Sequence, residues 1–166
     1  LHIGNKKNNI EPIPSVIPFQ KDVENTMPLS LDLLRQELAA SDLCPFKKTA
    51  TQIVFGDGNP KSKLLVLGEA PGFEEDVSGK PFMGPSGQLL DKMLSFIGID
   101  RQNCYMSNVL FWRPPHNNQP TDKDVAPTLC YLHQIIKIIH PKIILSLGST
   151  ATKALLDKTQ SITQLR

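Results

Sequence analysis

Three short apolar segments constrain the fold of this chain more than any other feature of its sequence. They are residues 64–67, 104–110 and 143–147. Each is shorter than a typical buried helix, and apolar side chains on both faces are typical of strands in a parallel sheet. Helical apolar patterns lie between and after them, over residues 86–97, 121–139 and 149–156. This alternation predicts an α/β fold with a mostly parallel central sheet and crossover helices.

Capping residues define where the predicted helices begin. Ser30 is the predicted N-cap of a further amphipathic helix that runs to about residue 40, and Ser86 is that of the first crossover helix. Thr121 and Asp124 fit a capping box at the start of the second crossover helix. The helix after Ser86 is predicted to carry one apolar stripe, made of Leu89, Leu90, Met93, Leu94 and Ile97.

Length and N-terminal composition set the domain organisation. Residues 1–28 contain several prolines and no periodic apolar face, which predicts an arm or linker. We expect one domain over residues 29–166, in keeping with a chain of 166 residues. Weakly alternating residues 49–55 predict a short edge strand, and residues 56–60 are a turn by composition. Residues 69–85 are expected to form one long loop.

Composition excludes several classes of protein. Hydrophobic residues make up 40% of the chain, and no apolar run approaches the roughly 18 residues that span a bilayer. The net charge of +2 excludes a polycation. Acidic side chains nevertheless predominate in residues 1–100 and basic ones in residues 101–166, so a polyanion would meet the second half. Three widely spaced cysteines predict a reduced, cytoplasmic protein without a disulfide framework or zinc knuckle.

Unusual residues follow the predicted strands at the edge where open α/β sheets bind ligands. After the first strand, Gly68 and Gly72 permit close backbone approach, and Pro71 stiffens the path between them. Carboxylates crowd the same segment, at Glu69, Glu74, Glu75 and Asp76. By composition alone this is a solvated acidic loop, whereas the glycines and proline favour a rigid pocket floor.

Two further segments reach the same edge. Phe82 is either a core residue or a stacking wall. Asn108 is either a turn former or a reader of a uracil-like ring, because its amide offers one donor and one acceptor side by side. Residues 112–118 combine a cation, an aromatic ring and amides, and form either a solvent-exposed loop or a contact with a nucleic-acid backbone.

Several ordered motifs resemble the family 4 uracil-DNA glycosylases, a bacterial and archaeal group typified by thermostable iron–sulfur enzymes. The resemblance covers about residues 30–166. Its motifs are Val54-Phe55-Gly56-x-Gly58-Asn59-Pro60, Gly68-Glu69-Ala70-Pro71-Gly72-x-x-Glu75-Asp76, Gly79-x-Pro81-Phe82-x-Gly84, Asn108 with Arg113-Pro114-Pro115-x-Asn117, and Pro141-x-Ile143-Ile144-x-x-Leu147-Gly148. The resemblance implies a three-layer αβα fold and a hydrolase that flips deoxyuridine out of DNA and releases uracil in base excision repair.

The resemblance also implies roles for individual residues. Phe82 would stack on the flipped uracil, and Asn108 would read its Watson–Crick edge. Glu69 and Glu75 are the candidates for catalysis, since Ala70 occupies the position of a water-activating Asp in other branches. Glu75 would either orient the water or wall off the ring's C5 against thymine. The remaining implied uracil-binding residues are Gly68, Ala70, Pro71 and Gly72, and the implied DNA-binding residues are Arg113, Pro114, Asn117 and Ser149.

The chain departs from the family pattern at two places. The family's four cluster cysteines correspond to Ser41, Cys44, Trp112 and about Thr128. We therefore predict no iron–sulfur cluster and no metal, with Trp112 packed near the vacated space and Cys44 a small buried hydrophobe. The family's later strand and its His-Pro motif, with a catalytic histidine, have no counterpart before Arg166. We expect a domain that lacks them.

The leading interpretation is a monomeric, cytoplasmic uracil-DNA glycosylase that acts on uracil-containing DNA. Two alternatives stay open: a catalytically impaired relative that binds DNA or uracil, and a small nucleotide-binding module that uses the same sheet edge. Release of uracil from a labelled oligonucleotide separates the active glycosylase from the catalytically impaired relative. Binding of free mononucleotides but not of DNA would favour the nucleotide-binding module.

Overall fold

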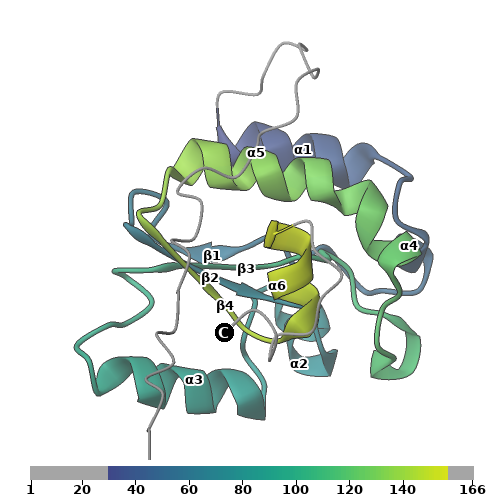
Figure 1. Cartoon of the computed structure of the whole chain (residues 1–166). Helices are drawn as coiled ribbons and strands as arrows, with labels where there is room; N and C mark the ends of the chain where they lie inside the picture. The colour runs from purple at the N-terminus through teal and green to yellow at the C-terminus, as the bar shows by residue number, and fades with distance from the viewer. Residues whose placement is uncertain (1–29, 157–166) are drawn as a thin grey trace, which may run out of the picture.

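The computed structural model describes residues 30–156, and Figure 1 draws the rest of the chain as a thin grey trace. The predicted arm of residues 1–28 and the last ten residues of the predicted domain therefore lie outside the described residues. Between residues 30 and 156, no helix is both long enough and apolar enough to cross a bilayer.

The described sheet has four strands in the order β1-β3-β2-β4. The central strand β2 (Leu64–Gly68) pairs in parallel with β3 (Tyr105–Asn108) on one side and with β4 (Ile143–Ser146) on the other. The short β1 (Asp57–Gly58) pairs antiparallel with β3. The three strands expected from the apolar segments are confirmed, and so is their parallel pairing.

Helices cover both faces of this sheet and give three layers (Figure 1). α1 (Leu31–Ala40) and α5 (Leu129–Ile139) lie side by side on one face, and α3 (Pro85–Ser95) lies on the other. α6 (Ser149–Leu156) follows β4, as expected. The predicted αβα arrangement with a mostly parallel sheet is thus confirmed.

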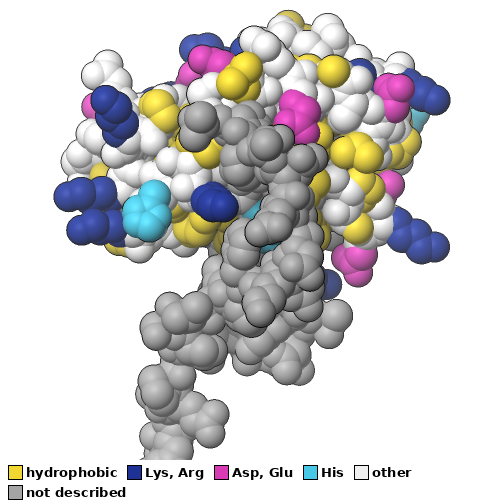
Figure 2. All heavy atoms as spheres, turned by 90° about the horizontal axis from the view of Figure 1, so that it is seen from above, with side chains coloured by type: hydrophobic (Ala, Val, Ile, Leu, Met, Phe, Trp, Pro, Cys, Tyr) yellow, Lys and Arg dark blue, Asp and Glu magenta, His cyan; other side chains and the backbone are white. Residues whose placement is uncertain are grey.

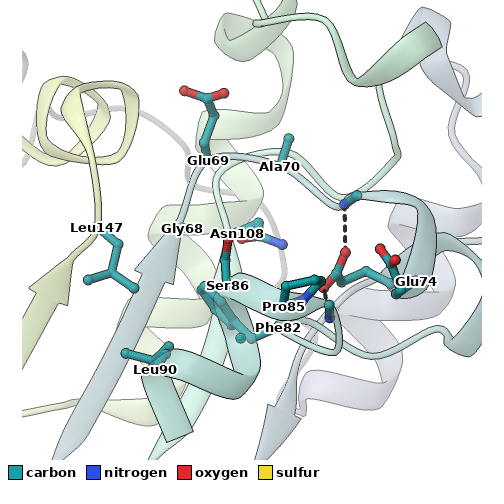
Figure 3. A pocket seen from close by; sticks show the side chains of 14 residues that line it. Gly68, Glu69, Ala70, Glu74, Phe82, Pro85, Ser86, Leu90, Asn108 and Leu147 are labelled. Atoms are coloured by element: carbon teal, nitrogen blue, oxygen red, sulfur yellow. Dashed lines mark hydrogen bonds between the residues drawn. The ribbon is translucent and has the colours of Figure 1, made fainter. Parts of the chain in front are cut away.

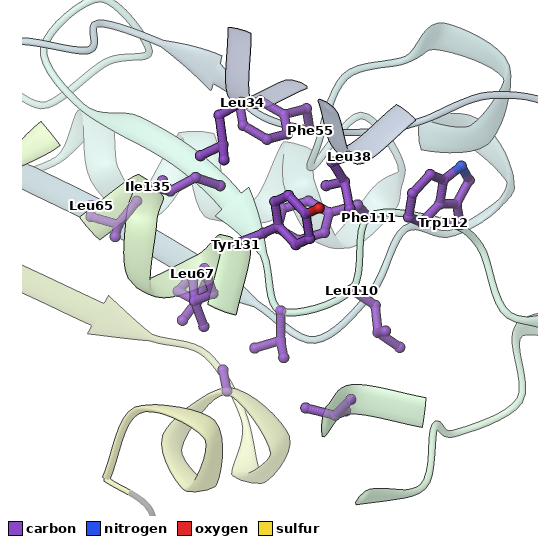
Figure 4. Close-up of a cluster of buried hydrophobic side chains, with 14 of the residues drawn as sticks. Leu34, Leu38, Phe55, Leu65, Leu67, Leu110, Phe111, Trp112, Tyr131 and Ile135 are labelled. Carbon is purple, nitrogen blue, oxygen red and sulfur yellow. The ribbon is translucent and has the colours of Figure 1, made fainter. Parts of the chain in front are cut away.

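The central strand contributes to two apolar clusters, because successive side chains of a strand point to opposite faces. Leu65 and Leu67 belong to the larger cluster, which packs under α1 and α5 (Figure 4). Val66 belongs to the smaller cluster with residues of α3. The helix α1 begins as predicted, since the Ser30 side chain accepts a hydrogen bond from the Leu33 amide at 3.3 Å.

The predicted edge strand over residues 49–55 is wrong. The backbone amide of Thr51 donates to Asp76 Oδ1 at 2.8 Å, so this segment is bound to a carboxylate instead of to a neighbouring strand. A 3-10 helix, Pro45–Lys48, precedes it. The edge strand is β1, which takes up Asp57 and Gly58 of the turn expected over residues 56–60. A turn follows at Pro60, where the Ser62 amide donates to the Asn59 carbonyl at 3.0 Å.

Three predictions for residues 69–97 also need correction: a loop, a helix N-cap and an apolar stripe. The expected loop over residues 69–85 contains a helix, α2 (Phe73–Ser78). α3 has Gly84 and not Ser86 as its N-cap, and only Gly87, Leu90 and Leu94 of this helix are buried. The other members of the predicted stripe are exposed, namely Leu89, Met93 and Ile97. A helix buries a face spaced by three or four residues, and the adjacent positions turn outward.

The helix expected over residues 121–139 is interrupted. The capping box is confirmed, since the Thr121 amide donates to Asp124 Oδ2 at 2.8 Å. α4 (Asp122–Val125) then passes into a 3-10 turn (Ala126–Thr128) before α5 begins. Pro127, which has no N–H to donate, accounts for the break. A further 3-10 turn, Pro115–Asn117, lies in the loop after β3.

Candidate active site

A cavity of about 460 Å³ opens at the carboxyl ends of β2 and β3 (Figure 3). Three candidate residues from three separate segments share it: Glu69 after β2, Phe82 before α3, and Asn108 at the end of β3. The lining is completed by Gly68, Ala70, Gly72, Glu74, Glu75, Gly84, Pro85, Ser86, Gly87, Leu90 and Leu147. Parallel pairing explains this convergence, because Gly68 and Asn108 are direct partners in the β2–β3 ladder.

Gly68 allows the aromatic ring and the amide to meet above the end of β2. A Cβ atom on Gly68 would lie 2.8 Å from Phe82 Cζ and closer still to Asn108 Oδ1. Both contacts are shorter than van der Waals separation, so any larger residue would push the two side chains apart. The glycine expected to permit close approach therefore does so toward Phe82 and Asn108.

Asn108 is a buried polar residue at the wall of the cavity, with 3% of its surface exposed. Its backbone is held in the ladder with β2. Its side-chain amide has no hydrogen-bond partner among the described residues. Buried polar groups are normally paired. An amide left without a protein partner beside a cavity is therefore available to a ligand.

Glu75 is buried, with 8% of its surface exposed, and its carboxylate is fully engaged by the backbone. One oxygen accepts hydrogen bonds from the amides of Met83 at 2.7 Å and Gly84 at 2.8 Å. The other accepts from the Gly72 amide at 2.9 Å. The carboxylate thereby ties the start of α2 to the segment that carries Phe82, as the dashed lines in Figure 3 show.

Glu69 differs from Glu75 in its surroundings. It is only half-buried, and one of its oxygens accepts a hydrogen bond from the hydroxyl of Thr150 in α6. In Figure 3 its side chain lies at the rim of the cavity and points away from the Phe82 ring. The second oxygen has no hydrogen-bond partner within residues 30–156. Glu69 is therefore the carboxylate of the pair that can still orient a water molecule.

The predicted DNA-binding residues lie outside the cavity lining. Arg113 Nε donates to Asn117 Oδ1 at 2.7 Å, and the guanidinium lies 5.1 Å from the centre of the exposed Phe73 ring. Pro114 is buried and Ser149 is exposed at the start of α6. On the visible part of the face over α1 and α5, basic and acidic side chains are interspersed (Figure 2).

Pro71 is the one predicted uracil-binding residue that does not line the cavity, although it is buried. Four residues that were not predicted also line the cavity, namely Pro85, Ser86, Leu90 and Leu147. Leu147 had a usable signal, since it follows the third parallel strand and so reaches the same sheet edge as Gly68 and Asn108. The hydrogen bond from Thr150 to Glu69 had no signal in the sequence, because it depends on where α6 packs.

The positions that correspond to the family's cluster ligands do not fit a four-thiolate cluster. Cys44 is 1% exposed in the larger apolar cluster, and burial raises the pKa of its thiol. Trp112 is 3% exposed in the same cluster, as predicted. The hydroxyls of Ser41 and Thr128 donate to backbone carbonyls, at 2.8 Å to Leu38 and 3.0 Å to Val109. The described residues contain no group of three or more potential metal ligands.

A family model and several curated relatives indicate one family. The model of the uracil DNA glycosylase superfamily matches residues 55–165. The chain is 41% identical over 124 residues to the type-4 uracil-DNA glycosylase of Archaeoglobus fulgidus, a match that covers 75% of this chain and 62% of that protein. It is 37% identical to the type-4 enzyme of Thermotoga maritima, with coverages of 82% and 71%. For that of Sulfurisphaera tokodaii the identity is 37%, with coverages of 82% and 64%.

Proposed function

The chain belongs to the uracil DNA glycosylase superfamily, and from this premise we propose that it hydrolyses the N-glycosidic bond of deoxyuridine in DNA during base excision repair. It spans about two thirds of the length of the curated relatives that it matches. The observation that carries the proposal is the meeting of the Phe82 ring and the Asn108 amide above Gly68 in one cavity.

Recognition of uracil follows from these two side chains. The Asn108 carbonyl would accept the hydrogen bond of uracil N3–H while its NH₂ group donates to O4. Cytosine presents an unprotonated N3 and an N4 amine, which reverses both partners. A site built on such hydrogen bonds discriminates by about 10⁴ or more. The Phe82 ring would stack on the flipped base, a contact worth about 1–3 kcal/mol.

Catalysis is proposed to rest on fixed charges. Cleavage leaves an oxocarbenium-like sugar and an anionic uracil, so groups aimed at the two developing charges lower the barrier. The Asn108 NH₂ group would stabilise the base. Glu69 would orient the attacking water and favour the sugar cation, because one of its oxygens is still available. Glu75 would shape the wall near the base, since its oxygens already accept three backbone hydrogen bonds.

The proposed contacts to the DNA backbone come from the loop after β3 and the start of α6. Arg113 and Asn117 are joined by a hydrogen bond, and Pro114 and Ser149 complete the set. Phosphate contacts of this kind position a nucleic acid without reading its sequence. We further propose that the enzyme acts as a monomer and that it works in the cytoplasm; the free thiols at Cys44, Cys104 and Cys130 support the second of these proposals. No iron–sulfur cluster takes part, because the residues at the ligand positions do not fit one.

A uracil-release assay tests the proposal. Single- and double-stranded oligonucleotides with one labelled dU are incubated with the protein and then cleaved at abasic sites by alkali. We expect release from both, and none from matched strands with dT or dC. Absence of release from the dU strand, in a preparation shown to be folded, would overturn the proposed activity.

A second candidate function is binding of DNA or uracil without turnover. One observation favours it. The family resemblance implies a catalytic histidine, but no histidine lines the cavity formed by residues 30–156, since His116, His133 and His140 all lie elsewhere on the surface. The same preparation decides between the two functions. Saturable binding of the dU strand without any release supports this second candidate, and release excludes it.

A further inference from the structure

Phe82 has a backbone conformation that its residue type rarely adopts. Its φ angle is 58°, in the left-handed region. The other non-glycine residues with positive φ in residues 30–156 are His116, Asn117 and His140, whose types are enriched there. For a bulky aromatic residue this conformation is strained and persists only where neighbouring groups hold it.

Arg101 holds the two peptide groups on either side of the Phe82 Cα atom. Its Nη1 donates to the Pro81 carbonyl at 3.0 Å, and its Nη2 donates to the carbonyl of Phe82 itself. The orientations of these two successive peptides define φ and ψ of the residue between them. A single guanidinium thus fixes the backbone angles from which the aromatic ring projects.

The guanidinium is itself held in place by carboxylates from two other elements. Arg101 Nε lies 3.1 Å and 3.2 Å from the two oxygens of Asp91 on α3. Its Nη1 lies 3.7 Å from Asp57 on β1. The planar fork of arginine presents several donors in fixed directions, whereas the ammonium of lysine is one flexible point charge. The arrangement therefore needs the shape of arginine as well as its charge.

Two further contacts restrict the same segment. The Met83 amide, which belongs to the peptide after Phe82, donates to Glu75 at 2.7 Å. A Cβ atom on Gly87 would collide with the Phe82 backbone, so α3 approaches that peptide as closely as it can. Arg101 and Glu75 thus hold opposite ends of one peptide group, and neither depends on the Phe82 side chain.

We propose that Arg101 is a positioning residue that holds the Phe82 ring where a flipped uracil stacks. The proposal rests on the proposed glycosylase function, and it adds a residue that does not line the cavity and acts only through Phe82. Without the guanidinium, the backbone of Phe82 relaxes from its left-handed conformation, and the ring leaves the wall of the cavity.

Single-turnover excision from a single-stranded dU oligonucleotide tests this role, because no duplex opening contributes. We expect Arg101→Gln and Arg101→Lys each to lower the rate at subsaturating enzyme by about 10- to 100-fold, the range expected for loss of one base–aromatic stack. The control is Lys80→Gln, which removes an exposed charge paired with the same Asp57 at 3.4 Å and should leave the rate unchanged. A rate for Arg101→Lys equal to that of the parent would overturn the proposal.

A double-mutant cycle separates positioning from a general loss of stability. If Arg101 acts through the ring, Arg101→Gln should cause no further loss of rate in a Phe82→Ala background. The same fold-loss in both backgrounds would show that Arg101 acts elsewhere and would overturn the proposal. All rates are measured well below the unfolding temperature of the least stable variant.

A readout independent of activity keeps this proposal distinct from the proposed function. Fluorophenylalanine placed at position 82 should give one narrow ¹⁹F resonance in the parent and a broadened or split resonance in Arg101→Gln. An equally narrow, unshifted resonance in the variant would overturn the proposal. A parent that releases no uracil would contradict the glycosylase function alone, while the ¹⁹F comparison would still test whether Arg101 orders the ring.

Discussion

The hydroxyl of Thr150 donates a hydrogen bond to Oε2 of Glu69, although the two residues follow different strands of the sheet. Glu69 comes directly after the central strand β2, and Thr150 lies in the first turn of α6, after β4. The bond restrains one oxygen of the proposed water-orienting carboxylate. It therefore gives α6 a role in placing a group at the cavity rim.

Replacement of Thr150 tests this role. Thr150→Val keeps the shape of the side chain but removes the donor, so we expect the single-turnover rate of uracil release to fall about 10- to 150-fold, as for loss of one hydrogen bond to a charged group. Thr150→Ser keeps the hydroxyl and should retain most of the rate. A Val variant as fast as the parent would show that the bond does not matter for catalysis.

Asn108→Ala should abolish base recognition and leave the fold nearly intact. We expect at least a 100-fold loss of excision, because both proposed hydrogen bonds to uracil disappear. The free energy of unfolding should change by less than about 1 kcal/mol, since the amide has no protein partner to lose among the described residues. The matched control is Gln102→Ala, an exposed amide away from the cavity. Excision by Asn108→Ala at the parent rate would refute the assignment.

Glu75→Gln and Glu69→Gln should separate stability from catalysis. Glu75 accepts three backbone hydrogen bonds while buried, and a carboxamide replaces one acceptor oxygen by a donor. We expect urea unfolding to report a loss of about 2–4 kcal/mol for Glu75→Gln. Glu69→Gln, at the half-exposed rim, should change stability by less than about 0.5 kcal/mol and still slow excision. The opposite pattern would exchange the proposed roles of these residues.

Gly68→Ala should impair the cavity by crowding. Its added Cβ would meet the Phe82 ring and the Asn108 amide, so uracil release should fall about 10-fold or more. Gly98→Ala is the comparison variant: a Cβ there meets nothing within 4 Å, and its φ of 73° exposes it to backbone strain alone. We expect Gly98→Ala to lower the unfolding temperature without changing the rate of the folded protein.

The parts of the fold that the sequence predicted depend on local patterns. The apolar run before Gly68 predicted β2, and the positions of Gly68 and Asn108 at strand ends predicted a shared edge, because parallel strands end together. Leu89 and Met93 have the right residue type for a buried stripe, but they precede the buried Leu90 and Leu94 and turn outward, so both are exposed. The limits of a buried face are set by the packing partner and not by the helix alone.

The contacts that shape the cavity could not be predicted because they join distant segments. The resemblance implies that Glu75 is a candidate catalytic carboxylate, but its three backbone donors depend on the path of the chain between α2 and α3. Arg101 carries no local signal at all, since its partners lie on β1, α3 and the Phe82 segment. Threonine is common in strands, yet the backbone amide of Thr51 donates to the Asp76 carboxylate and not to a neighbouring strand.

The chain is expected to fold without an iron–sulfur cluster, and Trp112 and Cys44 provide the test. Both are buried in the larger apolar cluster, where burial raises the pKa of the Cys44 thiol. We predict a colourless protein whose unfolding temperature does not respond to a chelator. Cys44→Ala should cost about 1 kcal/mol, as for a small buried hydrophobe, while Trp112→Ala should cost about 3–5 kcal/mol through the cavity it leaves. A brown preparation, or a Cys44→Ala variant that loses both colour and fold, would show instead that the thiol binds a cluster.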